Sequence, residues 1–375
     1  MRDLDKYKRH FVFDISSGYI SGAVVYSSKE NTKPVIEFTT REKIETTTNA
    51  DLAELRKKTV IALDNICSSL ADFVNLRVGE FFIESGSVFL SSPWVNFRNY
   101  NLKDEAIKPF TVSDYYLEGV LSSSLETNKR KAKKTLIDSQ IVTVKANGYI
   151  TNLNNIVGQS ISNLEISALD SLMNGYNKKF IEKVINNHFP FLRLKFNSYL
   201  PVLFNQIRYI YDLEDDFIFL DVTDSVTEFG IFSDNKIINI SSLPIGKSYI
   251  LKEIISQGLA SDRRIAQTIF SMYLRREVEE NIKLKVKDII DTFSRKLKEY
   301  IYNIFNKTGV SNIPINIFIL TDKETRFLLR NSDIFQDPQK LIFIDENLIK
   351  KFVDDESNDF NPFLALEVEY VFYDK

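Results

Sequence analysis

Cysteine and histidine are scarce in this 375-residue chain, which has one cysteine, Cys67, and two histidines, His10 and His188. A single cysteine excludes a disulfide within the chain and a cysteine-rich zinc site, and it is compatible with a reducing cytoplasm. Two histidines argue against a catalytic or metal centre built on imidazole groups.

Long apolar runs and a strong excess of one charge are also lacking. The most apolar segment of nearly membrane-spanning length, residues 301–320, is interrupted by polar residues, glycine and proline, so we expect no transmembrane helix. Residues 1–10 are charged and do not have the pattern of a secretory signal. The formal net charge of -3 predicts no general affinity for nucleic acid.

The length exceeds that of one ordinary domain and suits two lobes, each with its own core. Residues 217–246 contain three apolar runs separated by short polar turns, a pattern typical of an antiparallel meander of buried strands. The first run ends at Asp221 and is followed by Thr-Asp-Ser at 223–225. The motif also occurs 207 residues earlier, where an apolar run ends at Asp14 and Ser-Ser-Gly follows at 16–18. Two such hairpins predict two similar lobes whose turns face each other across a cleft, as when a nucleotide is held between two halves.

These two hairpins resemble the two phosphate-binding motifs of the actin-like ATPase superfamily. Within it, the chain is most similar to FtsA-type cell-division proteins and PilM-type pilus-assembly proteins. Three further segments resemble segments of those proteins: the Ser-Pro-Trp turn at 92–94, the Asn-Gly-Tyr turn at 147–149 and the Leu-Pro-Ile-Gly segment at 243–246. Trp94 is better explained as simply a large core or rim residue. The resemblance implies an α/β fold that is actin-like and two-lobed, built from duplicated ribonuclease H-like domains with an inserted α+β subdomain.

The same resemblance divides the chain into five segments. They are a first lobe at 1–101, an inserted FtsA/PilM-type subdomain at 102–173, a return to the first lobe at 174–212, a second lobe at 213–335, and a C-terminal segment at 336–375 that packs back on the lobes. Apolar spacing predicts helices over 50–76, 177–187, 249–256, 262–274 and 278–304. We expect a polar helix after Leu102, strands at 141–144, 148–150 and 161–169, an irregular stretch from 188 to 211, and a strand at 363–372.

The resemblance places a nucleotide cleft, with ATP and Mg²⁺, between the two hairpins. The candidate cleft residues are Asp14, Ser16, Ser17, Gly18, Asp221, Thr223, Asp224, Ser225, Thr227, Thr321 and Asp322, and Asp14 and Asp221 are the candidate magnesium ligands. Both aspartates are equally explained as strand ends.

The chemistry of these turns departs from that of the family. Phosphate-binding turns need glycine because a Cβ keeps backbone N–H groups away from phosphate oxygens. Here Ser16 and Thr223 stand where the family has glycine, and Asp224 would repel a phosphate by about 1 kcal/mol at 4 Å in water. The turn expected to hold the adenosine, residues 321–325, contains no glycine. We therefore predict weak or lost ATP binding.

The leading functional hypothesis is a degenerate actin-like scaffold that links partners at the inner membrane in pilus assembly or cell division. The alternative is an active ATPase that polymerises or switches on nucleotide. The resemblance implies a cytoplasmic location, with recruitment to the membrane through the cytoplasmic tail or a peptide of a membrane protein, and self-association is a further option. Residues 363–372 lack the basic amphipathic anchor of FtsA-type proteins, so we expect no direct membrane insertion. The five cations among residues 128–134 are explained as a solvated loop or as a contact for anionic lipid or an acidic partner.

Overall fold

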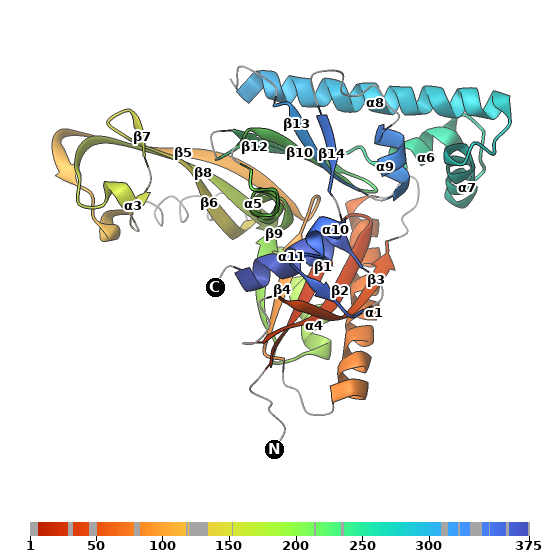
Figure 1. Ribbon diagram of the computed structural model, residues 1–375, viewed down its shortest axis with the longest axis horizontal. Coiled ribbons are helices and arrows are strands. Elements are labelled where there is room, and N and C mark those ends of the chain that lie inside the picture. The colour runs from red at the N-terminus through yellow and green to blue at the C-terminus, as the bar shows by residue number, and fades with distance from the viewer. Residues whose placement is uncertain are drawn as a thin grey trace.

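The computed structural model describes most of the chain. The described residues are 7–28, 33–44, 51–78, 83–117, 119, 134–151, 153–213, 215–233, 236–308, 314–321, 323–330, 340–344, 346–357 and 360–373. They form three sheets with covering helices, two of them stacked in layers and the third projecting to one side (Figure 1). Of the expected site and surface residues, Asp322 and residues 128–133 lie outside this described part.

The first lobe contains a six-stranded sheet in the order β15-β3-β2-β1-β4-β9. Its strands are β1 (Tyr7–Ile15), β2 (Tyr19–Ser28), β3 (Val35–Lys43), β4 (Ser85–Leu90), β9 (Arg193–Ser198) and β15 (Asp354–Asp355). The expected hairpin is present, because β1 pairs antiparallel with β2. On its other side β1 pairs in parallel with β4, which makes it a central strand.

The second lobe contains a five-stranded sheet in the order β12-β11-β10-β13-β14. Its strands are β10 (Phe217–Val222), β11 (Thr227–Ser233), β12 (Lys236–Leu243), β13 (Asn316–Thr321) and β14 (Lys340–Phe343). The predicted meander is confirmed, and β10 pairs antiparallel with β11 and parallel with β13. The central strands β1 and β10 thus have matching neighbours, and each ends one residue after its aspartate.

Helices cover the outer face of each of these two sheets, and further helices lie between the sheets. On the outer face of the first sheet lie α1 (Leu52–Val78) and α4 (Gly175–His188), and on that of the second lie α6 (Lys247–Ser256), α7 (Arg263–Leu274) and α8 (Glu280–Thr308). Between the sheets, α5 (Tyr199–Tyr211) and α11 (Pro362–Tyr373) share one apolar core with both of them. Two shorter helices are α9 (Lys323–Arg330) and α10 (Glu346–Ile349). Figure 1 shows α8 along one side of the molecule and α1 and α4 on the other.

The third sheet, in the order β5-β8-β6-β7, is the module inserted after the first strands of lobe one. It consists of β5 (Val95–Thr111), β6 (Lys134–Ala146), β7 (Tyr149–Thr151) and β8 (Ser160–Asn174), with the short helix α3 (Leu153–Ile156). The turn at Asn147 and Gly148 has positive φ at both residues, as its sequence predicts. The boundaries 102–173 remain a prediction, while the sheet itself extends from residue 95 to residue 174.

The polar helix expected after Leu102 does not begin there, because β5 continues to Thr111; within that region, residues 114–117 are helical. The polar residues of β5 form cross-strand contacts: Lys103 lies opposite Glu165, with 3.6 Å between the ammonium and the carboxylate. Such pairs stabilise a strand of low intrinsic propensity, so pairing with β8 decides the structure.

Two further expectations are wrong in the interior. The stretch after residue 188 contains β9 and α5 and is not irregular, and residues 363–372 form the helix α11 and not a strand. Leu364, Ala365, Leu366 and Val368 are all buried. A helix that is buried on nearly all sides has no polar face, so its apolar spacing does not distinguish it from a strand.

Candidate functional site

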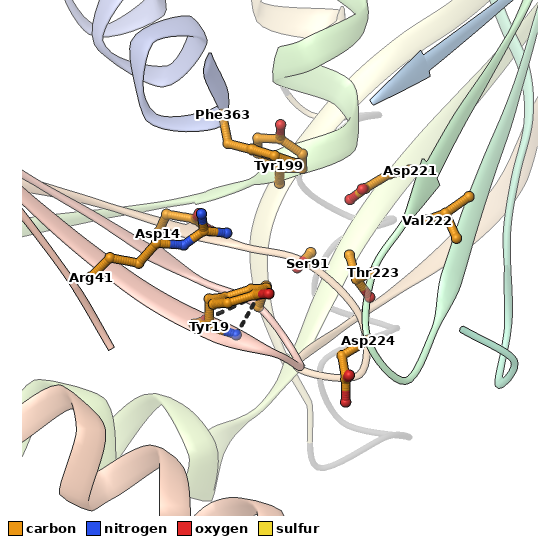
Figure 2. Close-up of a pocket in the computed structure, with 11 residues that line it drawn as sticks. Asp14, Tyr19, Arg41, Ser91, Tyr199, Asp221, Val222, Thr223, Asp224 and Phe363 are labelled. Atoms are coloured by element: carbon orange, nitrogen blue, oxygen red, sulfur yellow. Dashed lines mark hydrogen bonds between the residues drawn. The ribbon is translucent and has the colours of Figure 1, made fainter. Parts of the chain in front are cut away.

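The two aspartate hairpins meet between the lobes. Asp14 on β1 and Asp221 on β10 are both buried and line the same small cavity, on opposite sides of it (Figure 2). Tyr199 of α5 and Arg41 of β3 also line this cavity. The sequence therefore located the place where the lobes face each other, although Arg41 and Tyr199 carried no local signal.

The hydroxyl residues that stand in place of glycine close their own turns. Ser16 donates its backbone N–H and its hydroxyl to the carbonyl of Tyr19, each at 3.0 Å. Thr223 does the same to the carbonyl of Val226, at 3.0 Å from the N–H and 2.7 Å from the hydroxyl. Both turns thus use the same side-chain bond, which explains a hydroxyl residue at each position.

The two turns touch each other directly. The hydroxyls of Ser17 and Thr223 are 3.1 Å apart and form a hydrogen bond between the lobes. Gly18 packs so closely that a Cβ at this position would lie 2.7 Å from the Cβ of Asp224. The described cavity beside the two turns, which Asp14 and Asp221 line, has a volume of about 30 Å³.

The carboxylate of Asp224 already has a cation. Arg263 of α7 donates to both carboxylate oxygens at 2.8 Å, and Ser248 of α6 donates its hydroxyl to one of them at 2.5 Å. At the start of α6, the backbone N–H groups of Lys247 and Ser248 donate to the carbonyls of Thr223 and Asp224. The first N–H groups of a helix are a common anion site, and here the second turn itself uses two of them.

Gly246 makes this docking possible. A Cβ at residue 246 would lie 2.4 Å from the carbonyl oxygen of Thr223 and 2.6 Å from that of Asp224. A larger residue would push α6 away from the turn, so glycine is required here for close packing.

The Ser-Pro-Trp turn links both lobes. Glu228 on β11 accepts two hydrogen bonds from Ser92, at 3.1 Å from the N–H and 2.6 Å from the hydroxyl. The indole N–H of Trp94 donates to the carbonyl of Ser16 at 3.2 Å, and Trp94 is fully buried. The core interpretation of Trp94 is therefore right, and the same residue also holds the first turn in place.

Besides Asp224, four carboxyl groups lie buried around the cavity. Burial raises the pKa of Asp14 to about 7, against a smaller lowering effect of Arg41, and burial raises the pKa of Glu228 to about 7 against its bonds from Ser92. The pKa of Asp221 is raised well above its ordinary value by burial and then by Glu228 and Asp14. Burial, with a smaller effect of Asp14, does the same to the pKa of Glu367 on α11. Burial therefore favours the protonated form of Asp221 and Glu367.

The remaining predicted cleft residues mainly support the backbone. Thr227 donates its hydroxyl to the carbonyl of Ile245 at 2.7 Å, and Thr321 donates to the carbonyl of Val222 at 2.9 Å. The hydroxyl of Ser225 makes only a 3.4 Å contact with the neighbouring carboxylate of Asp224.

The turn expected to hold an adenosine is connected to the helices of its own lobe. Glu324 accepts hydrogen bonds from Lys247 of α6 and from Gln267 and Ser271 of α7, at 2.8, 2.9 and 2.8 Å. The Lys247 ammonium is buried against this carboxylate. These polar groups bond to one another in the place where the resemblance implies contacts to a nucleoside.

The described cavity beside the two turns is too small for a nucleotide in this arrangement. Ligand pockets have volumes of roughly 300–1,000 Å³, about ten times the space present here or more. Magnesium ligation requires deprotonated carboxylates, and the raised pKa values of Asp14 and Asp221 oppose this. Among the residues that the structure describes, no group of three or more His, Cys, Asp or Glu side chains is arranged to hold a metal ion.

Comparisons with known proteins identify the fold. No family model and no curated protein matches the chain. A solved structure of a PilM-PilN type IV pilus biogenesis complex matches 97% of this chain and 95% of that chain, with a TM-score of 0.63 and 11% identity. Two others are a Bacteroides thetaiotaomicron protein with an actin-like ATPase fold and unknown function and the ethanolamine utilization protein EutJ of Carboxydothermus hydrogenoformans. The first has a TM-score of 0.42 and 9% identity, and each chain is 98% covered. The second has a TM-score of 0.45 and 14% identity, with 98% of this chain and 89% of that chain covered.

The chain has the actin-like ATPase fold, as its hairpins predict, and its fold is similar to that of a PilM protein. No helix in the described part is long and apolar enough to cross a membrane.

Proposed function

We propose that this chain is a PilM-like scaffold that binds the cytoplasmic tail of a membrane protein and acts without a nucleotide between its lobes. The observation that carries the proposal is the direct contact of the two turns, which leaves about 30 Å³ where the fold would otherwise hold a ligand. The cleft then serves as an interface between lobes, and the function lies on the outer surfaces.

The lobe interface has the properties of a permanent contact. It combines the bond between Ser17 and Thr223, the two bonds from Ser92 to Glu228, and buried carboxyl groups. Ionising those carboxyls against each other is costly in a buried site. A nucleotide cycle would have to disrupt these contacts at every turnover, whereas a scaffold keeps them.

The third sheet offers an edge for an extended tail. β6 pairs with β8 along its length, but it pairs with β7 only through residues 144–146. Asp138 near the start of β6 accepts two bonds from Ser198, which holds that part against the first lobe. Within the described part, residues 139–143 therefore have one edge without a strand partner, and Ile141 there is 36% exposed. An extended peptide adds to such an edge through backbone hydrogen bonds.

The partner class comes from the fold match. A PilM protein was solved in complex with PilN of type IV pilus biogenesis, and we extend a pilus-assembly role to this chain from that likeness. Cell division is the other role that the resemblance to FtsA-type proteins offers. In both, the protein acts at the cytoplasmic face of the membrane through a partner.

Capture from solubilised native envelopes tests the tail-binding site. We expect the wild-type protein to retain a membrane protein. A synthetic peptide of that protein's cytoplasmic tail should also bind the wild type, and the Ile141→Asp variant should lose affinity for the peptide as it loses retention of the membrane protein. Ile141→Asp should reduce retention at least about tenfold, because a charge at the edge opposes strand addition. Ile265→Asp, on α7 and 44% exposed, is the matched control and should retain the partner.

Equal retention by both variants would contradict the edge site. Sedimentation velocity of the wild type and the Ile141→Asp variant distinguishes self-association, because concentration-dependent oligomers that the edge variant lacks would indicate filament contacts and not tail binding.

A further inference from the structure

A second cavity lies at the end of β1 that is opposite to the turns. It has a volume of about 390 Å³ and is lined by the first residues of β1, β4 and β9 together with Tyr370 and Val371 of α11. It borders the core that α11 shares with both lobes, because Tyr370 and Val371 pack against that core. This cavity is more than ten times larger than the one between the turns.

Its charged lining is entirely cationic. Lys8, Arg193 and Lys195 line the cavity, and none of the described lining residues is a carboxylate. Arg193 also forms an ion pair with Glu84, whose carboxylate lies 2.9 Å away. Both side chains are more than half exposed, so this pair is weak. The ammonium of Lys195 lies 5.8 Å from the ring centre of Tyr370. A concave surface with charges of one sign concentrates the field and attracts ions of the opposite sign.

Hydrogen-bond donors form the inner wall. The two ring nitrogens of His10 bond to the hydroxyls of Ser85 and Ser87, at 2.8 and 2.9 Å. A neutral imidazole has one N–H, so one serine accepts from it and keeps its own O–H for another acceptor. The buried side chain of Asn197 lines the same wall, and its amide nitrogen donates to the carbonyl of Lys195 at 3.5 Å.

We propose that this pocket binds a phosphate-bearing anion. A single carboxylate group has one negative charge and two acceptor oxygens, too few to pair with three cations and at least one hydroxyl donor. A phosphate ester or diphosphate has the charge and the acceptor oxygens for all of them. The volume is within the range of small-molecule sites. The phosphate belongs to a soluble metabolite or to a lipid head group, and both present the same chemistry to the pocket.

Calorimetric titration with inorganic pyrophosphate, at constant ionic strength in chloride, tests the pocket. We expect the wild type to bind saturably, with a dissociation constant below about 1 mM. The Lys8→Gln/Lys195→Gln double variant should bind at least tenfold more weakly. Lys285→Gln/Lys287→Gln on α8 removes the same charge from an exposed surface that does not line this cavity and should change the dissociation constant less than twofold.

Sedimentation with vesicles of phosphatidylcholine, with and without phosphatidylglycerol, distinguishes the two sources. A lipid site makes the wild type, but not the Lys8→Gln/Lys195→Gln variant, sediment with the anionic vesicles. A soluble phosphate gives pyrophosphate binding without sedimentation. The proposal is overturned if neither probe binds, or if both double variants lose affinity equally, since this would reflect diffuse attraction. These outcomes are independent of tail capture, which tests the proposed function.

Discussion

Separation of the two turns should cost enough free energy to keep the affinity for Mg-ATP low. A nucleotide can enter only if the bond between Ser17 and Thr223 and the two bonds from Ser92 to Glu228 are broken. At about 1 kcal/mol for each hydrogen bond, opening costs about 3 kcal/mol, which is about a hundredfold in affinity. A preformed site of about 1 μM would thus become weaker than about 100 μM, corresponding to less than roughly 5.5 kcal/mol of binding free energy.

The variant Thr223→Gly/Asp224→Gly tests the reasoning. It removes the bond to Ser17, releases Arg263 for an incoming phosphate and eliminates a carboxylate. We expect the affinity for Mg-ATP to rise at least about tenfold. Ser225→Gly is the control in the same turn, because its hydroxyl makes only a 3.4 Å contact with its neighbour, and it should bind like the wild type.

Isothermal titration calorimetry with Mg-ATP measures both effects, after circular dichroism has verified that each variant is folded. Low-micromolar binding by the wild type would refute the closed-cleft explanation and favour the active ATPase. Equal affinity of the double variant and of Ser225→Gly would show that the turns are not the obstacle.

Three further predictions concern stability, each measured by urea unfolding. Arg263→Ala should lower the free energy of unfolding by about 2–3 kcal/mol, since it leaves a buried carboxylate without its cation, whereas exposed Arg264→Ala should change it by less than about 0.5 kcal/mol; similar losses would contradict the ion pair. Ser92→Ala should cost about 1–3 kcal/mol, whereas Ser91→Ala should be nearly neutral because its buried hydroxyl has no partner among the described residues; the reverse order would refute the link between lobes. The folded state raises the pKa of Asp14 from 3.8 to about 7, so the contribution of its protonated form to the free energy of unfolding is fully present below about pH 4 and is lost as the pH rises through 7. The stability of Asp14→Asn relative to the wild type should therefore increase over this interval, and a difference independent of pH would disprove the raised pKa.

The sequence predicted the two hairpins well because their signal is local. Strands β1 and β10 are short apolar runs that end in aspartate before small polar residues, and this pattern depends on burial and on turn chemistry within about ten residues. The same local reasoning identified Ser16 and Thr223 as departures from the family. Their compensating role, as closures of their own turns, appears only with the backbone in view.

The contacts that close the cleft could not be predicted from the sequence. Ser92 and Glu228 are 136 residues apart, and Asp224 and Arg263 are 39 apart, so no periodic pattern relates them. The sequence led us to expect Asp224 to face a phosphate, whereas the fold brings a cation from α7 to it. Similarly, α11 was mistaken for a strand because its burial between two sheets erased the polar face by which a helix is normally identified.

The position of α11 and β15 constrains how this chain acquires its structure during synthesis. β15 adds to the sheet of the first lobe beside β3, pairing Asp354 with Val35, and α11 completes the core between the lobes. The lobe whose strands emerge first from the ribosome therefore remains without one strand and one covering helix until residue 373 has been made. Domains usually fold as units in the order of their synthesis, but here the first lobe depends on β15 and α11, which are translated after all the strands of the second lobe. A nascent chain arrested before residue 354 should therefore expose the apolar face that α11 covers and recruit chaperones, while one arrested after release of residue 373 should not.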